Sequence, residues 1–169
     1  GRRELENDLA MVYNNLGFAL SDRGETDGAI EAYKNAREIL DRLVAAGQSE
    51  LENDLAEVCN NLGYALRTRG HLDGAIEAYE KAVDIWDRLV TAGRRELENN
   101  LAAVYNNLGG ALTRRGEPDG AVEAFAKAQE IWERLVTAGR RELENDLATV
   151  YNNLGTALID RGELGGAIE

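Results

Sequence analysis

The tetrapeptide Asn-Asn-Leu-Gly at residues 14–17 decides the fold of this chain, because it recurs at residues 60–63, 106–109 and 152–155. The copies are a constant 46 residues apart. A fixed period of this length indicates stacked structural repeats, each of which buries its apolar face only against a neighbour. Units that begin at residues 1, 47, 93 and 139 give three complete repeats, 1–46, 47–92 and 93–138, and a partial fourth, 139–169.

Apolar residues around the tetrapeptide follow the spacing of two amphipathic helices. The first helix of the repeat (helix A), predicted over residues 4–22, has a buried stripe of Leu5, Leu9, Val12, Leu16 and Leu20. The second helix (helix B), predicted over residues 28–45, has a buried stripe of Ala29, Tyr33, Ala36, Leu40 and Leu43. Gly24 and Gly47 follow the two helices as stop signals. The predicted fold is therefore all-α, a right-handed α-solenoid of stacked antiparallel helical hairpins that forms one domain over residues 1–169.

Composition narrows the classes of function. The chain of 169 residues carries 31 acidic and 19 basic side chains, a formal net charge of −12. This charge argues against binding to nucleic acid or to an anionic membrane, which needs a basic patch. It favours a basic or mixed protein segment as partner. No apolar run is long enough to span a membrane, and Cys59 is the single cysteine, so we expect a cytoplasmic protein.

These hairpins resemble the tetratricopeptide repeat family. The helix-A signature of the family matches Tyr13, Leu16, Gly17 and Leu20, and its helix-B signature matches Ala29, Tyr33 and Ala36. The unit is longer than the usual 34 residues. In this respect the chain is similar to the repeat arrays of kinesin light chains. Asp41, Asp87 and Glu133 replace the proline that usually closes helix B, and Cys59 replaces one signature aromatic. The resemblance implies that helix A lines a concave surface that binds peptides.

The candidate site lies on the face of helix A opposite the leucine stripe. Asparagine occupies the positions of Asn7, Asn14 and Asn15 in every copy, whereas residues between them vary. The candidate peptide-binding residues are Asn7, Met11, Asn14, Asn15, Phe18, Asn53, Glu57, Asn60, Asn61, Tyr64, Arg67, Asn99, Asn106, Asn107, Arg114, Asn145, Asn152 and Asn153.

The asparagines suit a peptide backbone, because each carboxamide offers both an acceptor and a donor. Specificity would then come from the variable positions. Met11, Phe18 and Tyr64 form an apolar patch. Arg67 and Arg114 can bind an acidic group of the ligand. The alternative is structural, since asparagines at this period can also bridge neighbouring helices of the stack.

Other polar and reactive residues favour structural roles. Cys59 replaces a core aromatic, and Trp86 and Trp132 occupy the core position of Leu40. His71 is the only histidine, and no nucleophile recurs with a base. Acidic residues at the start of helix A suit the helix dipole without a metal. We therefore predict a protein that is not an enzyme and needs neither cofactor nor metal.

The predicted function is a protein-interaction scaffold that holds an extended peptide or partner segment. The alternative is self-assembly, either end to end or as a dimer, through the terminal repeats. The first repeat has the same apolar pattern as the inner repeats, and the last stops early in helix B, so Leu147, Val150, Leu154 and Leu158 would lack part of their cover. A recently duplicated array and a designed array would share this close identity of units.

Overall fold

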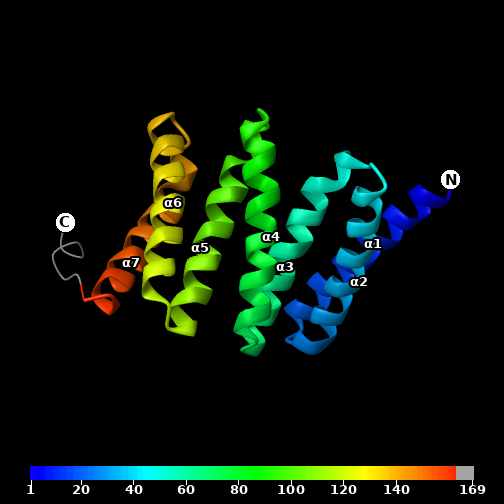
Figure 1. Ribbon diagram of the computed structural model, residues 1–169, viewed down its shortest axis with the longest axis horizontal. Coiled ribbons are helices and arrows are strands. Elements are labelled where there is room, and N and C mark those ends of the chain that lie inside the picture. Colours follow the sequence, from blue (N-terminus) through cyan, green and yellow to red (C-terminus); the bar gives the residue numbers. More distant parts are fainter. Residues whose placement is uncertain (163–169) are drawn as a thin grey trace. The chain divides into compact units, whose positions relative to one another are not determined.

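The computed structural model of the protein describes residues 1–162, and in that range the chain is helical without strands (Figure 1). The predicted all-α helical repeat is confirmed. The α-helices are α1 (Arg2–Asp22), α2 (Thr26–Ala45), α3 (Glu52–Arg69), α4 (Leu72–Thr91), α5 (Glu98–Arg115), α6 (Pro118–Thr137) and α7 (Glu144–Asp160). The start of the fourth helix B, expected within residues 163–169, lies outside the described residues.

Helix A starts differently in the later repeats. The residues before α3, α5 and α7 form short 3-10 helices, η1 (Ser49–Leu51), η2 (Arg95–Leu97) and η3 (Arg141–Leu143). In the first of these turns the Leu51 N–H donates to the Gln48 carbonyl at 3.1 Å. This tighter turn carries the chain out of the preceding helix and places Leu51 in the core.

Glycines end the helices as the sequence predicts. Gly47 has a φ of 95°, and the neighbouring Gln48 N–H donates to the Leu43 carbonyl at 3.1 Å. This is the bonding pattern of a helix end that needs a left-handed residue, which glycine adopts without steric cost. Glycines with positive φ recur every 23 residues, from Gly24 to Gly162. Each half-repeat therefore consists of one α-helix and the glycine that ends it.

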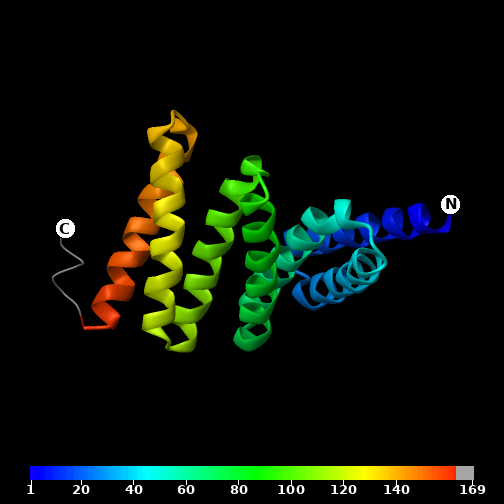
Figure 2. The same ribbon diagram turned by 45° about the horizontal axis from the view of Figure 1, so that its top comes forward.

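The chain divides into two compact units, residues 1–85 and 86–169, and each is described by itself. In the first unit, α2 packs against both α1 and α3 (Figure 1). In the second unit, α6 packs in the same way against α5 and α7 (Figure 2). Within each unit, a helix B thus lies between two A helices, which is the hairpin stacking expected from the repeat.

A glycine of helix A lies directly against an aromatic ring of helix B in three hairpins. A Cβ atom added to Gly17 would lie 2.6 Å from Cε1 of Tyr33. The same distance separates Gly63 from Tyr79, and Gly109 from Phe125. Real carbon atoms do not approach this closely, so glycine is required for the ring to lie against the helix backbone.

The two predicted apolar stripes behave differently in the first repeat. The helix-B stripe of residues 29, 33, 36, 40 and 43 is buried, as predicted. The prediction that α1 buries its stripe is wrong, because Leu5, Leu9, Val12 and Leu16 are exposed. The equivalent residues of η1 and α3 are buried, and these elements follow a helix B in their unit. Helix A therefore uses this stripe to pack against the preceding hairpin. In α7, which packs on α6, Val150 is buried, whereas Leu147, Leu154 and Leu158 are half-buried.

Candidate functional site

The predicted site residues lie on one face of each A helix, with varied exposure. On α3, Glu57 and Tyr64 are exposed, whereas Asn53, Asn60, Asn61 and Arg67 are half-buried. On α1, Met11, Asn15 and Phe18 are exposed, whereas Asn7 and Asn14 are half-buried. On α5, Arg114 is exposed, whereas Asn99, Asn106 and Asn107 are half-buried. On α7, Asn145 and Asn152 are exposed, whereas Asn153 is half-buried.

Two rows of asparagines are joined by hydrogen bonds between consecutive A helices. In the first unit, Asn61 Nδ2 donates to Asn14 Oδ1 at 3.3 Å. In the second unit, Asn153 Nδ2 donates to Asn106 Oδ1 at 2.9 Å. Asn61 and Asn153 therefore bridge neighbouring repeats, which is the structural role that the sequence left open. Oδ1 of Asn14 and of Asn106 accepts this bond, and the bond therefore sets the orientation of each carboxamide. The Nδ2 group of each then points away from the asparagine that donates the bond.

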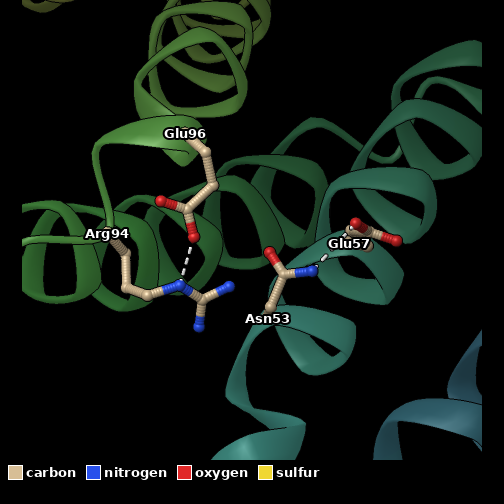
Figure 3. Close-up of polar contacts among 4 residues, drawn as sticks. All are labelled: Asn53, Glu57, Arg94 and Glu96. Carbon is tan, nitrogen blue, oxygen red and sulfur yellow. Dashed lines mark hydrogen bonds and ion pairs between the residues drawn. The ribbon is translucent and has the colours of Figure 1, made fainter.

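The asparagines nearest the start of helix A have other partners. Asn99 Oδ1 accepts a hydrogen bond of 2.8 Å from the indole nitrogen of the buried Trp132, so this oxygen is engaged inside the hairpin and is not presented to a ligand. Asn53 Nδ2 donates to Glu57 Oε1 at 3.1 Å on α3 (Figure 3). Asn7 Oδ1 is buried and has no hydrogen-bond partner among the described residues. The asparagines at the repeat position of Asn7 therefore take part in contacts within their own hairpin, which the sequence analysis did not expect.

Sequence reasoning missed the pairing of Asn99 with Trp132, although a signal for it exists. The position 33 residues after Asn99 is Trp132, and the same interval from Asn7 leads to Leu40. Leucine offers no donor, which explains why the buried oxygen of Asn7 has no partner. Burial of Trp86 and Trp132 agrees with the core role that the sequence predicts.

The variable positions differ in chemistry between the two units. In the first unit, Phe18 and Tyr64 present exposed aromatic rings, and the Arg67 guanidinium lies 5.4 Å from the centre of the Tyr64 ring. In the second unit, the positions equivalent to Phe18 and Tyr64 are Gly110 and Thr156. Thr156 turns its hydroxyl to the backbone carbonyl of Asn152, at 3.0 Å. Exposed aromatic side chains at these two positions therefore occur only in the first unit, whereas in the second unit an exposed aliphatic residue, Ile159, stands at the position of Arg67.

The buried aromatic rings beneath this face differ between hairpins in whether they carry a hydroxyl group and in whether that hydroxyl has a hydrogen-bond partner. Burial raises the pKa of Tyr33, and a hydrogen bond with Ser21 partly offsets this effect. Burial also raises the pKa of Tyr79, to about 12. The Tyr79 hydroxyl is buried without a hydrogen-bond partner among the described residues. In the second unit the equivalent ring is Phe125, which has no hydroxyl to satisfy.

Charged side chains form pairs at the hairpin ends. Arg134 Nη1 lies 2.9 Å from Oε2 of Glu98, a buried carboxylate. In the turn before α5, Arg94 pairs with Glu96 (Figure 3), and this hydrogen bond lowers the pKa of the Glu96 carboxyl. These contacts lie within one hairpin or one turn and stabilise it locally.

The residues that could carry chemistry are few. Among residues 1–162, no group of three or more His, Cys, Asp or Glu side chains is placed to hold a metal ion. Burial raises the pKa of the Cys59 thiol to about 12, so the reactive thiolate is scarce at neutral pH. In the same described part of the chain, no helix is long and apolar enough to cross a membrane.

Comparison with known proteins agrees with this architecture. The tetratricopeptide repeat family matches residues 8–88 and again residues 101–136. The crystal structure of BtubC (BKLC) from P. vanneervenii is similar over 94% of this chain and 59% of that protein, with 26% identity and a TM-score of 0.74. The apo form of RapI is similar over 96% of this chain and 40% of that protein, with 15% identity and a TM-score of 0.77, which shows a shared fold.

The chain thus spans 59% and 40% of the lengths of these two proteins. No curated protein sequence matches it. The two family matches together cover well over half of the chain and include the Gly-aromatic contacts of all three hairpins. The chain therefore belongs to the tetratricopeptide repeat family.

Proposed function

We propose that this chain is a protein-interaction scaffold that holds an extended peptide along the exposed face of its A helices. Tetratricopeptide repeats are generally protein-interaction scaffolds. The finer assignment, an extended peptide on this face, is supported chiefly by one observation. The hydrogen bonds that occupy Oδ1 of Asn14 and Asn106 leave the Nδ2 groups of these residues as donors.

Backbone carbonyl oxygens are the ligand groups that match these donors. An amide N–H can donate to any backbone carbonyl, whatever the side chain beside it. Packed helices lie roughly 10 Å apart, and an extended chain advances about 3.3 Å per residue. Consecutive A helices within one unit would therefore meet about every third carbonyl of the ligand.

The variable positions would select among the side chains of the ligand. Phe18 and Tyr64 give the first unit an apolar surface that suits an apolar ligand residue. Arg67 and the exposed Arg114 suit an acidic ligand group. The net charge of −12 favours basic residues elsewhere in the ligand, so a segment of mixed charge fits best.

The proposal contains no catalytic step, in line with the scaffold role that is general in the family. It also places the chain in the cytoplasm. That assignment is supported by the single cysteine, Cys59, which is buried and free.

The test is a peptide-library screen followed by affinity measurement with single substitutions. Asn106→Asp keeps an oxygen that can accept the bond from Asn153 but replaces the donor with a second acceptor. If the donor holds a peptide carbonyl, this change should weaken binding about tenfold or more. Asn14→Asp should act in the same way on the first unit. Asn35→Asp makes the same chemical change on α2, outside the proposed face, and serves as the matched control.

Two outcomes decide the proposal. Loss of affinity in Asn14→Asp or Asn106→Asp, with unchanged affinity in Asn35→Asp, supports a peptide on the helix-A face. Equal affinity in all the variants contradicts it, because a ligand held elsewhere is indifferent to these donors. Alanine variants at Asn60 and Asn106 provide a second comparison that does not add charge.

A further inference from the structure

The hydroxyl of Tyr79 is a buried polar group without a hydrogen bond. Tyr79 is 0% exposed, and its hydroxyl has no partner among the described residues. Such a hydroxyl lowers stability, because it has lost its hydrogen bonds to water and has gained none within the protein. Groups of this kind are rare in native proteins. A ligand that supplies the missing hydrogen bond would therefore gain affinity from it.

The first hairpin shows where this hydroxyl lies. The rings of Tyr33 and Tyr79 occupy the same place in their hairpins, because a Cβ atom added to the glycine against either ring would lie 2.6 Å from Cε1. The Tyr33 hydroxyl is hydrogen-bonded with Ser21, near the end of α1. The position 46 residues after Ser21 is Arg67, on α3. The Tyr79 hydroxyl therefore points towards Arg67.

Arg67 and Tyr64 are the neighbours of this hydroxyl on the helix-A face. Beyond the dominant effect of burial, the charges that act on the pKa of Tyr79 are those of Arg67 and Tyr64. Arg67 is half-buried, and its guanidinium lies 5.4 Å from the centre of the exposed Tyr64 ring. A guanidinium has N–H donors and no acceptor, so it cannot accept a hydrogen bond from the Tyr79 hydroxyl. The group that satisfies both side chains at once is a negatively charged acceptor.

We propose that the second hairpin contains a carboxylate subsite, in which a carboxylate of the bound peptide pairs with Arg67 and accepts a hydrogen bond from the Tyr79 hydroxyl. This inference rests on the proposed peptide-binding face of the A helices. A carboxylate has two acceptor oxygens, so one can meet the guanidinium while the other meets the hydroxyl. Hydrogen bonds to an ionised group are roughly twice as strong as those between neutral groups.

Entry of the carboxylate requires a movement of Arg67. The Tyr79 hydroxyl is covered, so a ligand oxygen reaches it only after a neighbouring side chain moves. Long side chains at the surface change rotamer within nanoseconds. The contact of the guanidinium with the Tyr64 ring is weak at an exposed site, so a carboxylate can draw Arg67 away from the ring. The ligand then completes a hydrogen bond that the unbound protein lacks.

The neighbouring hairpins do not combine these two donors. In the first hairpin, the Tyr33 hydroxyl is already hydrogen-bonded with Ser21. In the third hairpin, Phe125 has no hydroxyl, and Thr113 stands at the position of Arg67. The Thr113 hydroxyl donates to the backbone of its own helix at 2.9 Å. Among the three hairpins that the structure describes, the subsite therefore belongs to the second.

Binding of an octapeptide library tests the subsite. The peptides have acetylated N-termini and amidated C-termini, and each sequence is present as a pair that differs only by Glu or Gln at one position. The unchanged protein should prefer the Glu peptide about tenfold or more among its best binders. Arg67→Gln should abolish this preference, and Tyr79→Phe should reduce it about threefold or more.

Tyr33→Phe is the matched control. It removes a tyrosine hydroxyl from the equivalent position of the first hairpin, where the hydroxyl already has a partner, so the preference for Glu should stay unchanged. Circular dichroism of the variants checks that they fold. A second library with free C-termini distinguishes the two sources of a carboxylate. A preference for the free over the amidated terminus that Tyr79→Phe reduces would assign the subsite to the end of the ligand chain.

The outcomes separate the subsite from the scaffold function. The subsite is supported if Arg67→Gln and Tyr79→Phe lose the carboxylate preference and Tyr33→Phe keeps it. It is overturned if Tyr79→Phe keeps the full preference, which would leave Arg67 to act alone, or if Tyr33→Phe loses as much. Peptide binding without a carboxylate preference in either library contradicts the subsite and leaves the scaffold function standing, whereas absence of peptide binding contradicts both.

Discussion

The indole nitrogen of Trp132 donates a hydrogen bond of 2.8 Å to Oδ1 of Asn99, joining helix B to helix A of one hairpin. In the first hairpin, Leu40 stands in place of this tryptophan, and the buried Oδ1 of Asn7 has no partner among the described residues. Two identical asparagines at the same repeat position therefore have different consequences for stability, because only one of them meets a donor.

We predict that Asn99→Leu destabilises the protein by about 1–3 kcal/mol, because the indole N–H loses its acceptor in a buried site. Asn7→Leu should cost less than this or even stabilise, since it removes a buried oxygen that makes no hydrogen bond. Urea unfolding of the two variants gives the comparison. Equal destabilisation by both changes would contradict the assigned role of the Trp132 contact.

Gly63→Ala should destabilise by about 1–3 kcal/mol, despite the higher helix propensity of alanine. The new methyl group would lie 2.6 Å from the Tyr79 ring, so the ring or the helix must move. Gly74→Ala is the matched control, since its methyl group would lie 3.4 Å from Leu66 Cδ1, an ordinary contact. Thermal unfolding should place Gly63→Ala clearly below the parent and Gly74→Ala at or above it.

Tyr79 should make the fold sensitive to alkaline pH. Burial raises its pKa from 10.0 to about 12, so the folded chain holds the phenolic proton more tightly than the unfolded chain does. The ionisation of Tyr79 therefore has no effect on stability below pH 10, and the folded state loses stability as the pH rises from 10 towards about 12, because the unfolded chain ionises first. Tyrosinate absorbance should show this late ionisation.

Tyr79→Phe provides the control for that titration. It removes a buried hydroxyl without a partner, so it should be neutral or stabilising at neutral pH and should shift alkaline unfolding to higher pH. Phe125 already occupies this position in the second unit. An unchanged alkaline transition in Tyr79→Phe would assign the pH sensitivity to other groups.

The Cys59 thiol should resist alkylation in the folded protein. Burial raises its pKa to about 12, and the side chain is fully covered. Iodoacetamide at pH 8 should therefore react only when the chain unfolds, at a rate that rises with denaturant. Rapid labelling without denaturant would show that the region around Cys59 opens readily.

The repeated pattern determines most of the fold. The interval between the Asn-Asn-Leu-Gly copies, the two apolar stripes and the glycine stops predict helical hairpins, because these signals are local in sequence and depend on helix periodicity and on positive φ. The family follows from Gly17 and Tyr33 and their equivalents. The prediction of one continuous domain over residues 1–169, with a right-handed superhelix, stays a prediction.

The roles of individual polar residues depend on tertiary structure. Asparagines at three repeat positions look alike in sequence, yet Asn61 bonds to Asn14 in the neighbouring repeat and Asn99 bonds to a core tryptophan. Likewise, Leu9 and Leu55 have equivalent sequence environments, but one is 45% exposed and the other 3%. Periodicity determines which face of a helix a residue occupies, whereas only the packing of neighbouring hairpins decides what covers that face.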